Sequence, residues 1–386
     1  MSDAEGGCQK EILESRERVL RTIDHEPVDR MPIDLGMHYS TGISAFAYWE
    51  LREYLNLRIE DVYIPDMVQF LAKVEEDILE IFHCDCILLH PGWSRTHRWN
   101  PRGKYEFIIP KSAQPRSNEN CDWVMETDEG KMRMPKNGFF FDGDWLDLEE
   151  RSEDETIKAT AEEARRIYTE TDYFTAYIGF SSYYGQSMDF LCRMIEDPAS
   201  IKEQNKVLLE KEIEKAMKII ESMGESIQAI CMAGDLGTQQ GPMVRPSLYE
   251  ELCAPFLEKF CRFIHENGDL KVFLHTCGSI KPFMSTFIDC GVDVLNPVQI
   301  SADNMDPREL KEEFGEKITF WGGGCNTQKV LGRGTPKEVK ENVKKLVNIF
   351  KPGGGFVFNQ VHNIMGNVPP ENIVAMMDAA YETSFF

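Results

Sequence analysis

Short apolar runs rich in β-branched and aromatic residues recur along the chain, and longer amphipathic stretches separate them. Eight runs have the character of buried strands, and they begin at residues 31 (MPIDLG), 85 (DCILLHPG), 173 (YFTAYIGFSS), 227 (IQAICMAGDLG), 271 (KVFLHTCG), 292 (VDVLNPVQ), 318 (ITFWGGG) and 354 (GGFVFNQVHN). Strands that alternate with helices predict a parallel sheet with right-handed crossovers. Eight such units predict an α/β fold of the (β/α)8 TIM barrel type. A doubly wound open sheet has the same alternation, and periodicity alone does not exclude it.

Two regions depart from the alternation. Residues 94–147 are rich in Pro, Gly and Asn and contain short alternating runs, which predicts a β-hairpin insertion after the second strand. Residues 1–25 have the pattern of an N-terminal helix packed outside the barrel. We therefore expect residues 1–386 to form a single barrel domain with these two additions.

Acidic residues dominate the charge of the chain. Asp and Glu number 65 against 42 Lys and Arg, so the net charge is −23. Such a surface repels nucleic acid phosphates and anionic lipids, so neither is expected as a partner. Since no run reaches about 18 consecutive apolar residues and the N-terminus lacks the apolar core of a signal peptide, we expect a cytoplasmic protein. The 11 cysteines are then thiols or ligands rather than disulfides.

The fifth predicted strand ends in an unusual pair, His275 and Cys277. Active sites of parallel barrels lie at the C-terminal ends of the strands. Residues i and i+2 on a strand face the same side. The imidazole and the thiol are therefore expected to point into the same barrel mouth, where they suggest a metal site.

A third ligand would complete a catalytic zinc site, which usually has three protein ligands and one open position. Cys325, in FWGGGCNTQ, ends the seventh predicted strand, and the glycines before it let the backbone approach a ligand closely. His275, Cys277 and Cys325 are thus the predicted metal ligands. The plainer interpretation also stands: His275 can be a hydrogen-bonded pocket residue, and buried Cys is common in cores.

Five stretches of this chain occur in a familiar order: RVLRTIDHEPVDRMPIDLG, AGDLGTQQGPMVRPSLYEE, FLHTCGSIKPFMSTFIDCGVDVLNPVQ, FWGGGCNTQKVL and VHNIMGNVPPENI. Together they resemble the uroporphyrinogen decarboxylase superfamily from about residue 16 to the C-terminus. The resemblance implies a (β/α)8 barrel, in agreement with the eight predicted strands.

The superfamily contains two chemistries. Decarboxylases that act on uroporphyrinogen carry an arginine-rich motif near the first strand, whereas DLGMHYSTGISAFAYW here contains no arginine. Arginine is suited to gripping several carboxylates, so its absence argues against a porphyrinogen substrate. The other branch, the cobamide-dependent methyltransferases, resembles this chain in its HxC pair followed by a distant Cys. That resemblance implies zinc on His275, Cys277 and Cys325. Some members take the last Cys from near the final strand, where this chain has NQVHN.

The resemblance implies a zinc-dependent methyltransferase. It would move a methyl group between a small methylated substrate, such as a methoxylated aromatic compound that undergoes O-demethylation, and a cobamide. Since the chain has no visible corrinoid-binding motif, the cobamide is expected on a separate corrinoid protein. We expect Asp235 and His362 to take part in catalysis, with His362 as a fourth ligand, a proton carrier or a hydrogen-bonding neighbour of the metal site. Five residues are predicted to bind substrate: Gln239, Asn296, Gln299, Tyr183 and Trp321.

Two other classes of function stay open from the sequence. One is a decarboxylase-like lyase that acts on a small substrate without a metal. The other is a barrel that binds a partner and does not catalyse. The identity of the substrate, the direction of the reaction and the formation of a homodimer are left open.

Overall fold

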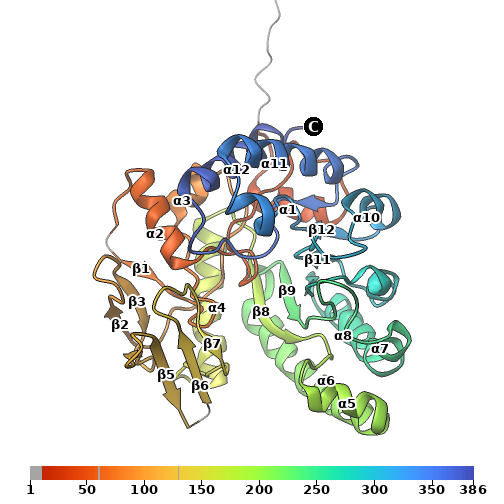
Figure 1. The fold of residues 1–386 in the computed structure, drawn as a ribbon. Helices are drawn as coiled ribbons and strands as arrows, with labels where there is room; N and C mark the ends of the chain where they lie inside the picture. Colours follow the sequence, from red (N-terminus) through yellow and green to blue (C-terminus); the bar gives the residue numbers. More distant parts are fainter. Residues whose placement is uncertain (1–10, 60, 129) are drawn as a thin grey trace, which may run out of the picture.

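The computed structural model describes residues 11–59, 61–128 and 130–386 (Figure 1). Six parallel strands form its main sheet in the order β13–β12–β11–β10–β9–β8. Their bounds are β8 (Ala176–Ser181), β9 (Ala229–Ala233), β10 (Lys271–His275), β11 (Val294–Asn296), β12 (Thr319–Trp321) and β13 (Phe356–Val357). Sequential strands are thus spatial neighbours, as the pattern of alternating strands and helices predicts.

Two further segments complete a ring of eight. Ile33 forms a parallel bridge with Phe358, directly after β13, and Cys86 forms one with Phe174, just before β8. The backbone N–H of Asp85 donates to the carbonyl of Ile33 at 2.7 Å, which joins the two segments to each other. The predicted (β/α)8 barrel is therefore confirmed, and the open-sheet alternative is wrong.

Helices surround the ring and bury its outer side. Their bounds are α1 (Ser15–Ile23), α2 (Ala45–Tyr54), α3 (Glu76–Ile81), α4 (Glu153–Glu170), α5 (Met188–Glu196), α6 (Pro198–Met223), α7 (Pro246–Leu252), α8 (Ala254–Asn267), α9 (Met284–Asp289), α10 (Pro307–Phe314), α11 (Pro336–Phe350) and α12 (Pro370–Glu382), with the short turns η1 (Gly224–Ser226), η2 (Lys281–Phe283) and η3 (Thr327–Leu331). Local sequence explains the helix starts: the Thr335 hydroxyl accepts from the Glu338 N–H in a capping box at α11. Within the described residues, no helix combines the length and apolar character that crossing a bilayer demands.

The interior of the barrel is apolar along most of its strands and becomes polar at their C-terminal ends. Phe273, Val294 and Trp321 are buried in an apolar interior cluster, which α1 closes at one end with Val19 and Ile23. Residues two positions further along the same strands lie on the same inward side. After Phe273 and Val294 these are His275 and Asn296, so polar side chains face inward at the C-terminal end of the barrel.

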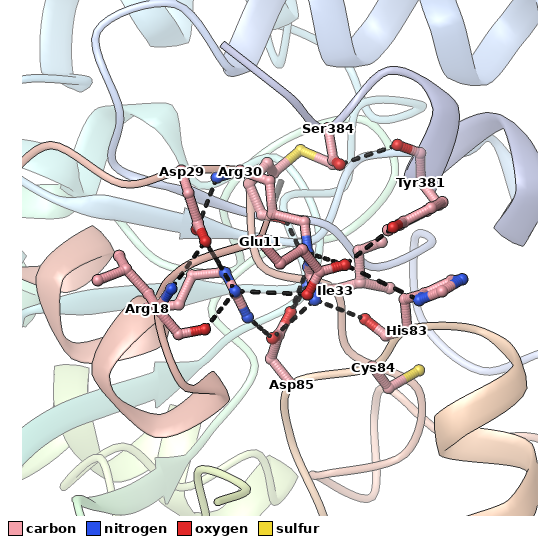
Figure 2. A network of polar contacts seen from close by, with 12 residues as sticks. Glu11, Arg18, Asp29, Arg30, Ile33, His83, Cys84, Asp85, Tyr381 and Ser384 are labelled. Carbon is pink, nitrogen blue, oxygen red and sulfur yellow. Dashed lines mark hydrogen bonds and ion pairs between the residues drawn. The ribbon is translucent and has the colours of Figure 1, made fainter. Parts of the chain in front are cut away.

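The N-terminal end of the barrel is held by a buried ion network (Figure 2). Asp85 is completely buried and accepts from Arg18 Nη1 at 2.6 Å and from Arg30 Nη1 at 2.7 Å. The Ile33 N–H donates to the same carboxylate at 2.8 Å. The network therefore ties α1 to the first two barrel segments.

The predicted hairpin region contains antiparallel strands. Its strands are β2 (Thr96–Trp99), β3 (Phe107–Pro110), β4 (Arg116–Ser117), β5 (Trp123–Thr127), β6 (Gly130–Met134) and β7 (Asp142–Gly143). The last four form one antiparallel sheet, while β3 also pairs in parallel with β1 (Val62–Tyr63), which precedes the region. Figure 1 shows this insertion beside the barrel, on the side away from α1 and the C-terminus. Of the predicted N-terminal helix, α1 is present, and residues 1–10 lie outside the described residues.

Candidate metal centre

The structure brings three possible metal ligands together at the C-terminal end of the barrel. His275 ends β10, and its Nε2 lies 3.5 Å from the Sγ of Cys277. His362, in the loop after β13, completes a group whose ligand atoms all lie within 4.8 Å of one another. The i and i+2 spacing therefore does place the imidazole and the thiol on the same side.

Hydrogen bonds select one tautomer of His275. Its Nδ1 lies 2.7 Å from Asn296 Oδ1, and the Asn296 amide is oriented because its Nδ2 donates to the Trp321 carbonyl at 2.9 Å. A carbonyl oxygen can only accept, so His275 carries its proton on Nδ1. The lone pair of Nε2 is thereby left facing Cys277, as a metal ligand requires.

Cys277 sits in a loop held by neighbouring strand ends. Its backbone N–H donates to Asp235 Oδ1 at 2.9 Å, and that oxygen is 3.6 Å from His275 Nε2. Burial, with a smaller contribution from Asp235, raises the pKa of the Cys277 thiol well above its usual value. The thiol is therefore protonated when alone, and a divalent cation would replace the proton.

The turn after Cys277 needs glycine. Gly278 has φ +91°, and a Cβ there would lie 2.2 Å from the backbone carbon of Gly237. The Gly278 N–H donates to Gln299 Oε1 at 2.9 Å, and Gln299 Nε2 donates to Gln239 Oε1 at 2.9 Å. The two glutamines predicted to bind substrate thus support the Cys277 loop.

His362 reaches the centre from a backbone with φ 62°. Its ring centroid lies 5.7 Å from that of His275. Burial, and then the proximity of His275, lowers the pKa of His362 to about 4, so the ring is neutral at pH 7. The Asn363 N–H donates to Nδ1 at 2.8 Å, which places the proton of the neutral ring on Nε2.

Cys325, the third predicted ligand, lies outside this group of possible metal ligands. It is completely buried in the apolar core, and its carbonyl accepts from the Val361 N–H at 3.0 Å. Among the described residues, the cluster of possible ligands comprises His275, Cys277 and His362 and does not include Cys325.

The two aromatic residues predicted to bind substrate, Tyr183 and Trp321, are also buried. Trp321 lies inside the barrel with no exposed surface, and its indole N–H donates to Asp34 Oδ2 at 2.8 Å. Tyr183 packs against Phe256 and Phe260 of α8, on the outer side of the sheet. The structure therefore does not bring these two side chains into the group formed by His275, Cys277 and His362.

One residue of this region carried no predicted role. The His38 ring stacks on that of His275, with centroids 5.5 Å apart, although it is only 5% exposed. The Ser40 N–H donates to His38 Nδ1, and no described residue partners its Nε2. Ser40 Oγ also donates to Asn296 Oδ1 at 2.5 Å, so His38 is linked to the hydrogen bonds that orient His275. In sequence, the only signal was a polar residue soon after the first strand.

The donor set fits zinc. Two imidazoles and a thiol are ligands that Zn²⁺ prefers, and three protein ligands leave a position open for a substrate. The tautomer of His275 meets the requirement that a ligating nitrogen be unprotonated. Nδ1 of His275 and Asn296 form the kind of outer hydrogen bond that orients a metal-binding histidine.

Comparison with known proteins agrees with the fold. The family model described as "Uroporphyrinogen decarboxylase (URO-D)" matches residues 180–383, just over half of the chain. A uroporphyrinogen decarboxylase of Legionella pneumophila (strain Corby) is 24% identical over 240 residues, which cover 60% of this chain and 65% of that protein. One of Vesicomyosocius okutanii is 30% identical over 76 residues, or 20% of this chain and 21% of that protein. The aligned parts thus span less than two thirds of these relatives.

A solved structure resembles nearly the whole chain. It is described as a methyltransferase from Methanosarcina mazei, with a TM-score of 0.59 and 17% sequence identity. The alignment covers 96% of this chain and 99% of that one. At this identity the likeness concerns the fold.

Proposed function

The chain belongs to the uroporphyrinogen decarboxylase family, and we propose that within this family it is a zinc-dependent methyltransferase. It would move a methyl group between a small methylated substrate, such as a methoxylated aromatic compound, and the corrinoid cofactor of a partner protein. The observation that carries the proposal is the approach of His275 Nε2 to Cys277 Sγ, 3.5 Å, beside His362. A thiol and an imidazole placed this way at a barrel mouth are suited to a cation.

The residues of the chain would divide the work between them. His275 and Cys277 hold the metal, while Asn296 keeps Nε2 of His275 unprotonated. Asp235 fixes the backbone of Cys277. Zinc, when bound, would supply a Lewis acid that draws electron density from the heteroatom carrying the methyl group.

His362 has two alternative roles, and the position of its proton distinguishes them. With Nδ1 accepting from the Asn363 N–H, its Nε2–H can donate a hydrogen bond to the heteroatom that loses the methyl group and stabilise the charge that develops there. If the hydrogen bond from the Asn363 N–H to Nδ1 is lost, the proton can move to Nδ1 and leave Nε2 free to be the third zinc ligand. Cys325, the ligand that the sequence predicts, would need a rearrangement of the buried core to reach the same place.

Metal analysis of the purified protein tests the proposal. We expect about one zinc per chain in the wild type and less than about a tenth of that in Cys277→Ala, with loss of methyl transfer to a corrinoid protein. A second variant, Cys325→Ala, removes the buried thiol that the sequence predicts as the third ligand. Retention of zinc by Cys325→Ala and its loss by His362→Ala would assign the third ligand to His362, and the reverse would assign it to Cys325.

The competing function is a metal-free lyase, which the names of the curated relatives favour. That function would need cationic groups to hold carboxylates. Residues 34–49, which begin at the end of the first strand, contain neither Arg nor Lys. Wild-type protein that is folded, free of zinc after growth in zinc-containing medium, and unable to bind added zinc would favour the lyase.

A further inference from the structure

A cavity of about 320 Å³ lies between the barrel and the hairpin insertion. Residues of four separate segments line it, among them Leu71, Phe140, Trp145, His362 and Ile364. His362 belongs to the candidate metal centre, so the cavity adjoins that centre. A methyl group presented by an occupant of this cavity could therefore reach the metal site.

The wall of the cavity is mostly apolar. Phe140 and Trp145, from the insertion, are 45% and 72% exposed, although large aromatic side chains are usually buried. Asp142 is the one charged residue among those that line the cavity within the described chain. A wall of this kind favours a neutral ring and disfavours an anion.

Ser44 supplies a polar group in this apolar wall. It occupies the N-cap position of α2, but its side chain makes no capping hydrogen bond. The residue is only 2% exposed, and its Oγ has no partner in the part of the chain that the structure describes. An unpartnered buried hydroxyl is costly, and a ligand that hydrogen-bonds to it would remove that cost.

We propose that this cavity binds the ring of a neutral methoxylated phenol and that Ser44 Oγ hydrogen-bonds the ring hydroxyl. The aromatic ring would pack against Trp145 and Phe140, and the methoxy group would face His362. The choice of substrate class rests on the proposed methyltransferase function, whereas binding of the ring depends only on the cavity.

Calorimetric titration with 2-methoxyphenol, on the full chain with and without zinc, tests the proposal. Trp145 should report binding through a change in its fluorescence. We expect Trp145→Ala to weaken binding about 10-fold, because a packed aromatic contact is lost. The control is Met188→Ala on α5, which removes another exposed apolar side chain, 74% exposed and outside the cavity, and should leave the affinity unchanged.

Methoxybenzene, which lacks the hydroxyl, isolates the role of Ser44. Ser44→Ala should weaken 2-methoxyphenol about five-fold and leave methoxybenzene unaffected, since one hydrogen bond is lost. Equal weakening of both ligands would contradict the hydrogen bond. Absence of saturable binding, or unchanged affinity in Trp145→Ala, would overturn the proposal.

The two proposals can fail separately. Binding of 2-methoxyphenol by Cys277→Ala protein, which should lack zinc, would support the cavity even if methyl transfer is never observed. Zinc binding without any affinity for 2-methoxyphenol would leave the metal centre standing and refute the cavity.

Discussion

Both ends of the barrel bury polar groups, but the two ends differ in how far those groups find partners within the chain. At the N-terminal end, Arg18, Arg30 and Asp85 are at most 2% exposed, and the Asp85 carboxylate accepts from both guanidinium groups and from a backbone N–H (Figure 2). At the C-terminal end, His38 Nε2 and Ser44 Oγ are buried without a partner among the described residues. Arg30 Nε also has no hydrogen-bond partner among the described residues, but it lies 3.2 Å from the Glu11 carboxylate, so the charges of the N-terminal end are balanced within the chain.

This difference distinguishes buried polar groups that stabilise the fold from buried polar groups that are available to a ligand. A buried donor or acceptor without a partner costs about 1–3 kcal/mol, so such groups are rare in folded proteins. Where several gather beside possible metal ligands, something outside the chain is expected to complete them. Changes at the N-terminal end should therefore alter stability, and changes at the C-terminal end should alter binding.

The largest effect is expected from Asp85→Ala. It leaves Arg18 and Arg30 buried without their shared carboxylate, and breaking a buried ion network in this way costs about 3–5 kcal/mol. Urea unfolding of wild type and variant gives the difference in free energy of unfolding. Zinc bound per folded molecule should not change, and a variant as stable as wild type would end the distinction between the two ends.

A smaller effect, on binding, is expected from Asn296→Ala. Without the Asn296 carbonyl, His275 loses the group that orients it and keeps its proton on Nδ1. Zinc affinity, measured by competition with a chelator, should fall about 10- to 100-fold, as for other outer hydrogen bonds to metal ligands.

The matched control for that variant is Asn372→Ala. Asn372 is also a buried amide, but it donates to the carbonyls of Leu331 and Gly334, away from the metal centre. Its loss should lower stability and leave zinc affinity unchanged. Equal effects of the two variants on zinc would mean that Asn296 acts only through the stability of the fold.

The sequence predicted the barrel because the apolar runs of the strands, and their alternation with helices along the chain, are visible in short stretches of sequence. It also predicted that His275 and Cys277 point to the same side, because the i and i+2 spacing continues from the end of the strand into the loop. It ranked Cys325 ahead of His362 as the third ligand, because both follow strand ends and only three-dimensional packing places one in the core and the other beside His275 and Cys277. The partner of Ser40, 256 residues away, is likewise invisible to local patterns.

The smallest predicted effect is a difference in the pH range over which each end of the barrel loses stability. His90 ends the second barrel segment, and burial, with Lys73 and Arg151 nearby, lowers its pKa to about 3. Because the unfolded chain binds a proton at a pKa near 6.5, the stability that neutral His90 contributes is lost as pH falls below that value. At the other end, burial alone would raise the pKa of Asp29, but Arg18 lowers it well below its usual range. The contribution of that carboxylate is lost only below about pH 4.

Between pH 7 and pH 5.5, the free energy of unfolding of wild type should therefore fall by about 1 kcal/mol more than that of His90→Asn. Asparagine is the suitable replacement, because its Oδ1 can still accept the Gly92 N–H that His90 Nδ1 accepts at 3.0 Å. Burial raises the pKa of Asp34 to about 6, so uptake of a proton by Asp34 stabilises the folded state as pH falls. This change is the same in both proteins and cancels in the difference. An equal fall in the free energy of unfolding for the two proteins across this range would show that His90 has the same pKa in the folded and unfolded states, and that the C-terminal end accommodates charge more readily than its buried surroundings imply.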